Sequence, residues 1–134
     1  MVRPFTREMA SIPALVAFVR EFLRQEGVTD ERAFDLDLVI EELFTNLVKY
    51  GRGARGMIDV GLTRESAQVV ITLREHGAEY HDPTAAPEVD VDRPIGERVP
   101  GGLGIHLVRK LSEDFRYEWR DGTATTTVTM RMKD

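Results

Sequence analysis

The sequence predicts an α+β fold, a two-layer sandwich in which three helices cover one face of a mixed, mostly antiparallel sheet of about four strands. Three segments carry apolar residues at helical spacing, each with a single apolar face. Four shorter segments alternate apolar and polar residues, as half-buried strands do, and turn signals join them in pairs. Because each helix has only one apolar face, we expect all three helices on the same side of the sheet.

Length and composition indicate one globular domain that spans residues 1–134. The chain is 42% hydrophobic and 31% charged, which is typical of folded domains. Its net charge of −5 argues against direct nucleic-acid binding, and the lack of cysteine excludes disulfides and thiolate sites. No apolar run is long enough for a membrane span and no signal peptide opens the chain, so we expect a cytoplasmic protein.

Two helices are expected in the first half of the chain. The first begins near Ser11 and stops at Gly27, where glycine ends the helical pattern. The second is capped by Thr29 or Asp30 and ends at Gly51, where a glycine-rich loop follows. Residues 1–10 show no pattern that assigns them to a helix or a strand.

The second half of the chain alternates strands with one helix. A long irregular segment over residues 75–102 separates the two hairpins and contains four prolines. A structureless stretch of this length is typical of a functional lid or of a disordered insertion, and we expect Ala85–Val99 to be mobile. The expected regular elements are strands at Ile58–Leu62 and Val69–Leu73, a helix over Leu103–Leu111, and strands at Phe115–Trp119 and Val128–Met132.

The second helix carries a polar pair at the edge of its apolar face. Glu42 and Asn46 are four residues apart, so they lie one turn above the other. A carboxylate and a carboxamide in that position can meet a ligand that lies against the core, and the amide oxygen suits a hard cation such as Mg²⁺. A solvated helix shoulder gives the same pattern, so the pair alone does not decide the function.

Two further features follow in the chain. Glu75-His76-Gly77 comes at the end of an expected strand, and the glycine cluster Gly101-Gly102-Leu103-Gly104 opens the third helix. Glycines at a helix N-terminus let backbone N–H groups approach an anion. A plain hinge explains the cluster as well when it is taken alone.

In this order and spacing the three features resemble the GHKL ATPase superfamily, and within it the small anti-sigma-factor serine-protein kinases. The resemblance runs from about Ile12 to the last strand and is most specific at Glu41–Asn46 and Pro100–Val108. It implies the Bergerat-type ATP-binding fold, with ATP and Mg²⁺ as cofactors. By that resemblance Glu42 is the catalytic general base and Asn46 is the metal ligand. Gly101, Gly102, Leu103 and Gly104 match the box beside the phosphates.

The resemblance also assigns a base pocket. Glu75 stands where the family usually has an aspartate that binds the adenine amino group, and Gly77 is the glycine that lets the base approach. Thr129 in the last strand is our match for a threonine that assists adenine binding. The segment over residues 77–83 is one residue longer than the family pattern.

The implied function is an anti-sigma regulatory factor with ATP-dependent serine-protein kinase activity. It would phosphorylate an anti-sigma antagonist protein and sequester a sigma factor, and the resemblance leaves a homodimer open. The glutamate at position 75 and the extra residue leave a second hypothesis open. In that hypothesis the chain is a protein-interaction module of the same fold that either does not depend on nucleotide or only binds ATP. A third hypothesis is that the chain is a generic ATPase or sensor-kinase catalytic domain.

Overall fold

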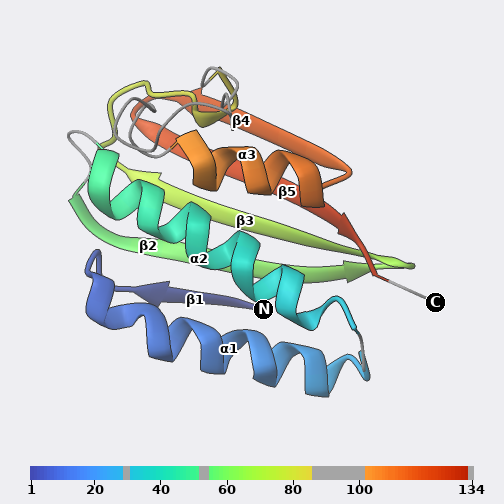
Figure 1. Ribbon diagram of the computed structural model, residues 1–134. Helices are drawn as coiled ribbons and strands as arrows, with labels where there is room; N and C mark the ends of the chain where they lie inside the picture. The colour runs from blue at the N-terminus through green and yellow to red at the C-terminus, as the bar shows by residue number, and fades with distance from the viewer. Residues whose placement is uncertain (29–30, 52–54, 86–101, 133–134) are drawn as a thin grey trace.

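Five strands form one sheet in the order β1-β2-β3-β5-β4, and each neighbouring pair is antiparallel. The computed structural model describes every residue except 29–30, 52–54, 86–101 and 133–134, and it leaves out the side chains of 55, 102 and 103. The strands, shown in Figure 1, are β1 (Val2–Phe5), β2 (Arg55–Glu65), β3 (Gln68–His76), β4 (Asp114–Arg120) and β5 (Thr123–Arg131).

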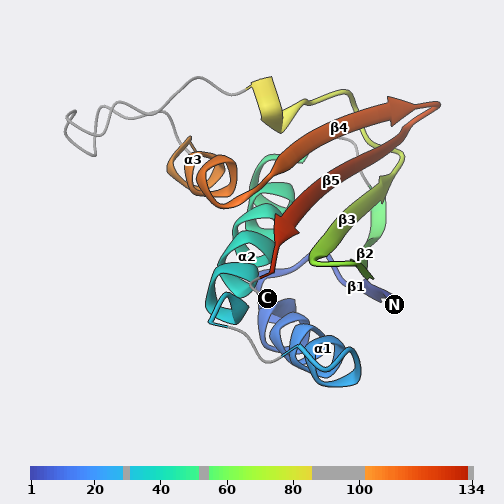
Figure 2. The same cartoon turned by 90° about the vertical axis from the view of Figure 1, so that its right-hand side faces the viewer.

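The helices α1 (Ile12–Gln25), α2 (Ala33–Tyr50) and α3 (Gly102–Leu111) all lie on one face of this sheet, as Figure 2 shows. There are also two short 3₁₀ turns in the described part of the chain, η1 (Met9–Ser11), which leads directly into α1, and η2 (Pro83–Ala85), which follows β3. The predicted fold class is therefore confirmed, with three helices on one side. The sheet has one strand more than expected, and the pairs described in it are all antiparallel.

The hydrophobic core fills the space between the helices and the inner face of the sheet. Alternation along each strand decides which residues point inward, because successive side chains of a strand face opposite sides. The apolar arc of α2 packs onto these inward residues, as the helical spacing predicts. Fully or nearly fully buried side chains come from α1 (Leu15, Phe18, Val19, Phe22, Leu23), α2 (Leu36, Val39, Ile40, Leu43, Phe44), β2 (Ile58, Val60, Leu62), β3 (Val69, Ile71, Leu73) and β5 (Val128, Met130).

The additional strand is β1, at the edge of the sheet beside β2. Phe5 is its one buried residue and packs against Phe18 and Phe44, with ring centroids 5.6 Å and 6.4 Å away. Pro4 is tolerated there because an edge strand leaves half of its N–H groups unpaired. One buried residue in a four-residue strand gives no alternation to detect, which is why the sequence pattern did not reveal it.

The start of α2 differs from the expectation. α2 begins at Ala33 with Arg32 as its N-cap residue, and no side chain caps it, so the predicted cap at Thr29 or Asp30 is wrong. Arg32 instead donates hydrogen bonds to the carbonyl oxygens of Leu111 and Arg131, at 3.0 Å and 2.8 Å. These bonds fasten the start of α2 to the ends of α3 and β5.

Candidate functional site

A small hollow lies between the C-terminal half of α2 and the first turn of α3. Its volume is about 110 Å³, and the residues that line it are Glu42, Thr45, Asn46, Lys49, Tyr50 and Gly104. Glu42 and Asn46 come from consecutive turns of α2, so the helix holds both on the side that faces α3. The structure therefore brings together two of the predicted site residues and one glycine of the predicted box.

Gly104 is in close contact with Glu42. A Cβ atom placed on Gly104 would lie 2.3 Å from Oε2 of Glu42 and 3.2 Å from its Cδ. A side chain at position 104 would force one of the two groups to move, so glycine is what allows the start of α3 to approach this carboxylate so closely. The N-terminus of a helix carries partial positive charge, which favours a carboxylate beside it.

The preceding acid, Glu41, has different surroundings. Burial is the largest cause that raises the pKa of Glu41, and the nearby charges of Asp37 and Glu42 raise it further. Asp37 is 8% exposed and forms an ion pair with Arg20 of α1. Burial raises the pKa of Asp37, and Arg20 offsets part of that shift. These two acids belong to the side of α2 that faces α1, so only Glu42 borders the hollow.

Glu75 lies at the end of β3 and is 4% exposed. Its Oε2 atom accepts a hydrogen bond from Nη2 of Arg7, and the two side chains form an ion pair. Arg7 also donates from Nη1 to the carbonyl oxygen of Leu47 near the end of α2, at 2.9 Å. The sequence analysis missed Arg7, because it is 68 residues away in the chain and lies in a segment without a pattern.

Gly51, directly after α2, is what lets this ion pair approach the helix end. A Cβ atom on Gly51 would lie 2.5 Å from the carbonyl oxygen of Leu47, 2.9 Å from Nη1 of Arg7 and 3.1 Å from Oε2 of Glu75. The end of α2 is therefore bordered by two close contacts. Glu42 meets Gly104 on the side of α3, and Glu75 meets Gly51 beside β3.

The loop after β3 folds back onto β4 and β5. Gly77 has a φ of +68°, and the next N–H group, of Ala78, donates to the carbonyl oxygen of Gly122 at 2.8 Å. Nε1 of Trp119 donates to the carbonyl oxygen of Ala78 at 2.9 Å. The predicted glycine at position 77 thus makes a left-handed turn that favours glycine.

The same loop is covered by aromatic side chains. The ring of Tyr80 packs edge-on against Tyr117 and Trp119, with centroids 5.5 Å and 6.5 Å away. The N–H group of His81 donates to the Tyr117 hydroxyl at 3.1 Å. Burial is the main cause that raises the pKa of Tyr117, and the charge of Glu75 adds to the shift. The lengthened loop is therefore fastened to the edge strand at the end nearest Glu75.

Thr129, the predicted adenine-binding threonine, does not lie on the face of the sheet that the helices cover. Along β5, Ala124, Thr126, Val128 and Met130 are the buried residues, so Thr129 faces the opposite side of the sheet from the helices. Thr126 is the threonine on the inner face, and it is 3% exposed. It pairs with Leu73 of β3 and Tyr117 of β4, one inward position along β5 from Ala124, which pairs with Glu75.

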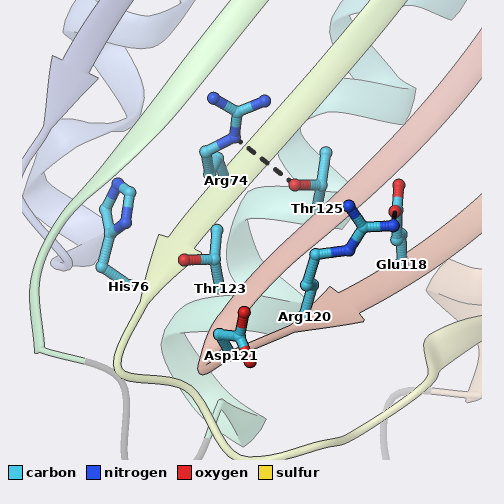
Figure 3. A pocket seen from close by; sticks show the side chains of 7 residues that line it. All are labelled: Arg74, His76, Glu118, Arg120, Asp121, Thr123 and Thr125. Carbon is cyan, nitrogen blue, oxygen red and sulfur yellow. Dashed lines mark hydrogen bonds and ion pairs between the residues drawn. The ribbon is translucent and has the colours of Figure 1, made fainter.

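A larger hollow, about 460 Å³, lies on the uncovered face of the sheet (Figure 3). Arg74 and Arg120 contribute positive charge, and Glu118 and Asp121 contribute negative charge. Nε of Arg74 donates to Oγ1 of Thr125 at 3.4 Å, and Arg120 lies 3.5 Å from Glu118. Because charges of both signs line this hollow, they do not indicate one class of ligand. This hollow is on the other side of the sheet from Glu42 and Asn46.

The family follows from comparison of the whole chain. Residues 5–132 match the histidine kinase-like ATPase domain family. The chain belongs to this family. A curated relative, the serine/threonine-protein kinase BtrW of Bordetella bronchiseptica, is 31% identical over 98 residues, which are 72% of this chain and 68% of the relative. The resemblance drawn from the motifs is thereby confirmed at the level of the family.

Solved structures of other proteins have a similar fold. The RsbU and RsbW domains of Rv1364c from Mycobacterium tuberculosis align over 98% of this chain with a TM-score of 0.66 and 17% identity, and this chain spans 32% of that one. The SiaB–SiaC complex from Pseudomonas aeruginosa aligns over 97% of this chain and 88% of that chain, with a TM-score of 0.55 and 16% identity. At these identities the likeness shows the fold alone.

Several expected features of this ATPase domain lie outside the residues that the structure describes. They are Gly101, the side chain of Leu103 and all of the expected mobile segment except Ala85. Where the chain is described, no group of three or more His, Cys, Asp or Glu side chains is placed to hold a metal ion. Arg109 of α3 donates from Nη2 to the carbonyl oxygen of Thr84. In the described part of the chain, no helix has the length and apolar character needed to span a membrane.

Proposed function

We propose that this chain is an ATP-dependent serine-protein kinase that phosphorylates a small anti-sigma antagonist and also sequesters a sigma factor. The observation that carries the proposal is the contact between Glu42 and Gly104, which holds one carboxylate at the first turn of α3 with Asn46 one turn away. Membership of the ATPase domain family supports the use of ATP. The name of the relative BtrW supports transfer to serine or threonine.

Glu42 would act as the general base. Its carboxylate would accept the proton of the substrate serine hydroxyl while that oxygen forms its bond to the transferred phosphoryl group. The close contact with Gly104 limits where the carboxylate can lie, which supports a defined position for this proton transfer. Glu41 is unsuited to the same role, because it lies on the side of α2 that faces α1.

Asn46 would supply the one protein oxygen to the metal. The described residues hold no cluster of acidic or histidine ligands, which fits an ion that takes most of its ligands from phosphates and water. Bound Mg²⁺ would neutralise the charge of the phosphates during transfer. Lys49, one turn from Asn46 and Thr45 on the same helix, would add a positive charge beside the same hollow.

The base would enter between Glu75, Gly77 and the inner face of β5. Thr126 takes the place first given to Thr129, because it is the threonine on that face. The Oε1 atom of Glu75 has no hydrogen-bond partner among the described residues, so it remains an acceptor for the exocyclic amine of adenine.

A second candidate is a module of the same fold that binds a partner protein and does not use nucleotide. The ion pair between Arg7 and Glu75 favours it, because the carboxylate expected to bind the base already has one buried partner. Entry of a base would have to leave that pair intact or replace it at a cost, since a buried carboxylate without a partner is strongly unfavourable.

Thermal unfolding with and without Mg-ATP separates the two candidates. At a ligand concentration of about 100 times Kd, binding stabilises the fold by about 2.7 kcal/mol, which raises Tm by roughly 10 °C in a domain of this size. Transfer is then measured from ATP labelled in the γ-phosphate to the protein that copurifies with the immobilised chain. A folded parent chain whose Tm does not respond to Mg-ATP, but which still retains its partner, would be the non-catalytic module.

A further inference from the structure

The ion pair between Arg7 and Glu75 joins parts of the chain that are distant in sequence. Arg7 follows β1, and Glu75 ends β3, while the carbonyl oxygen of Leu47 that Arg7 also binds belongs to the last turns of α2. Both charged side chains are largely buried, 17% and 6% exposed. Neither the proton transfer nor the binding of phosphates accounts for an arginine in this place.

Arg7 is fixed at two of its nitrogen atoms. Nη1 donates to the backbone of α2 and Nη2 donates to Oε2 of Glu75, so the guanidinium group ties the carboxylate to the helix end. The third donor, Nε, is buried and has no partner among the described residues. Buried donors in native proteins are nearly always bonded, so a water molecule or a ligand is needed to complete this environment.

Arg7 binds one carboxylate oxygen of Glu75 and leaves the other available. Glutamate has one methylene more than aspartate and one more rotatable bond, so its carboxylate has more positions to choose from. With Oε2 held by Arg7, rotation of the carboxylate is stopped and Oε1 points in one direction. The glycine at position 51 is required for this arrangement, because a Cβ atom there would lie 2.5 Å from the carbonyl oxygen of Leu47 and 2.9 Å from Nη1 of Arg7.

We propose that Arg7 is a positioning residue for purine recognition, which holds Oε2 of Glu75 so that Oε1 accepts a hydrogen bond from an exocyclic amine. The proposal rests on the proposed use of nucleotide. It goes beyond that function because it makes the ion pair between Arg7 and Glu75 responsible for preferring a purine with an exocyclic amine. It also explains how a glutamate could bind the base at position 75, where the family usually has an aspartate.

The test compares binding of Mg-ATP and Mg-ITP by isothermal titration calorimetry. ITP carries a keto oxygen in place of the amine, so it offers no exocyclic donor to Oε1. We expect the parent to prefer ATP by about tenfold or more, the effect of one hydrogen bond to a charged group. In Arg7→Met that preference should fall to near unity, because ATP binding weakens while ITP binding does not.

Two further variants make the test specific. Arg3→Met removes an arginine of β1 whose ion pair with Glu21 is on the surface, and it should keep the parental preference. In a Glu75→Asp background the shorter side chain no longer reaches Arg7, so Arg7→Met should leave the preference unchanged. An equal effect of Arg7→Met in both backgrounds would overturn the proposal.

Folding is checked for each variant by circular dichroism, since loss of Arg7 leaves a buried carboxylate without its partner. If Arg7→Met does not fold, Arg7→Lys is used with the same criterion, because its single amine cannot hold both oxygen acceptors in the same geometry. Equal weakening of ATP and ITP would mean that Arg7 is only structural, which overturns the inference alone. A folded parent that binds neither nucleotide would overturn the proposed function as well.

Discussion

Gly104→Ala perturbs the closest contact of the candidate site. The added Cβ atom would lie 2.3 Å from Oε2 of Glu42, whereas ordinary contacts begin at 3.4 Å. The carboxylate must therefore move by about 1 Å or more, since the backbone of α3 is less free to shift than the end of a side chain. Glu42 is only partly buried, so its side chain has room to rotate away from α3.

The expected effects on stability and on catalysis have opposite signs. Alanine is favoured over glycine within a helix by about 1 kcal/mol, so Tm should stay constant or rise slightly. A displacement of about 1 Å of a catalytic group costs on the order of 10²-fold in rate. Loss of the general base costs about 10²- to 10⁴-fold. We therefore expect phosphoryl transfer to fall by about 10²-fold in a variant that is as stable as the parent.

The assay measures kcat for transfer to the antagonist serine together with Kd for Mg-ATP. The control is Glu42→Gln, which keeps the shape of the side chain but cannot accept the proton. Because both changes act through one carboxylate, the double variant should be no slower than Glu42→Gln alone. Additive losses in the double variant, or full activity in Gly104→Ala, would refute the role of this contact.

Further outcomes are expected at other positions. Asn46→Ala should leave Tm unchanged and lower the affinity for Mg-ATP on the order of tenfold, with no difference from the parent when EDTA replaces Mg²⁺. Thr126→Val should weaken ATP binding about fivefold, which is the effect of losing one hydrogen bond. Thr129→Val, on the open face of the sheet, should leave ATP binding unchanged, and calorimetry on both variants tests the assignment. Because burial raises the pKa of Asp37 above its ordinary 3.8, the folded state holds its proton more tightly than the unfolded state. The contribution of Asp37 to the free energy of unfolding should therefore fall as the pH rises from 3.8 through the raised pKa. Asp37→Asn should remove this dependence of the unfolding free energy on pH, measured by urea unfolding.

The fold and half of the site could be predicted because they depend on local periodicity. The apolar arc of α2 identifies both the buried face and its shoulder, and Glu42 and Asn46 lie on that shoulder. Strand alternation likewise predicted the buried face of β2 and β3. These signals span a few residues each, so a single sequence contains them.

The features that were missed depend on contacts between distant residues. Nothing near Arg7 indicates that it will meet Glu75, because the contact requires β1 to pair with β2. The choice of Thr129 over Thr126 has a different cause, since the strand pattern already shows which threonine shares the buried face. Val128 and Met130 alternate with it, so a threonine on the buried face must stand at an even position, which is Thr126.

The two close contacts at the end of α2 predict different kinetic effects. In the proposed kinase, the contact of Glu42 with Gly104 positions the general base, so disturbing it should lower kcat and leave nucleotide affinity nearly unchanged. The ion pair of Arg7 with Glu75 would position the group that binds the base, so disturbing it should change Kd and selectivity and affect kcat less. A protein that only binds a partner would need neither contact. Separate effects on kcat and Kd would therefore favour the kinase over the binding module more strongly than either measurement alone.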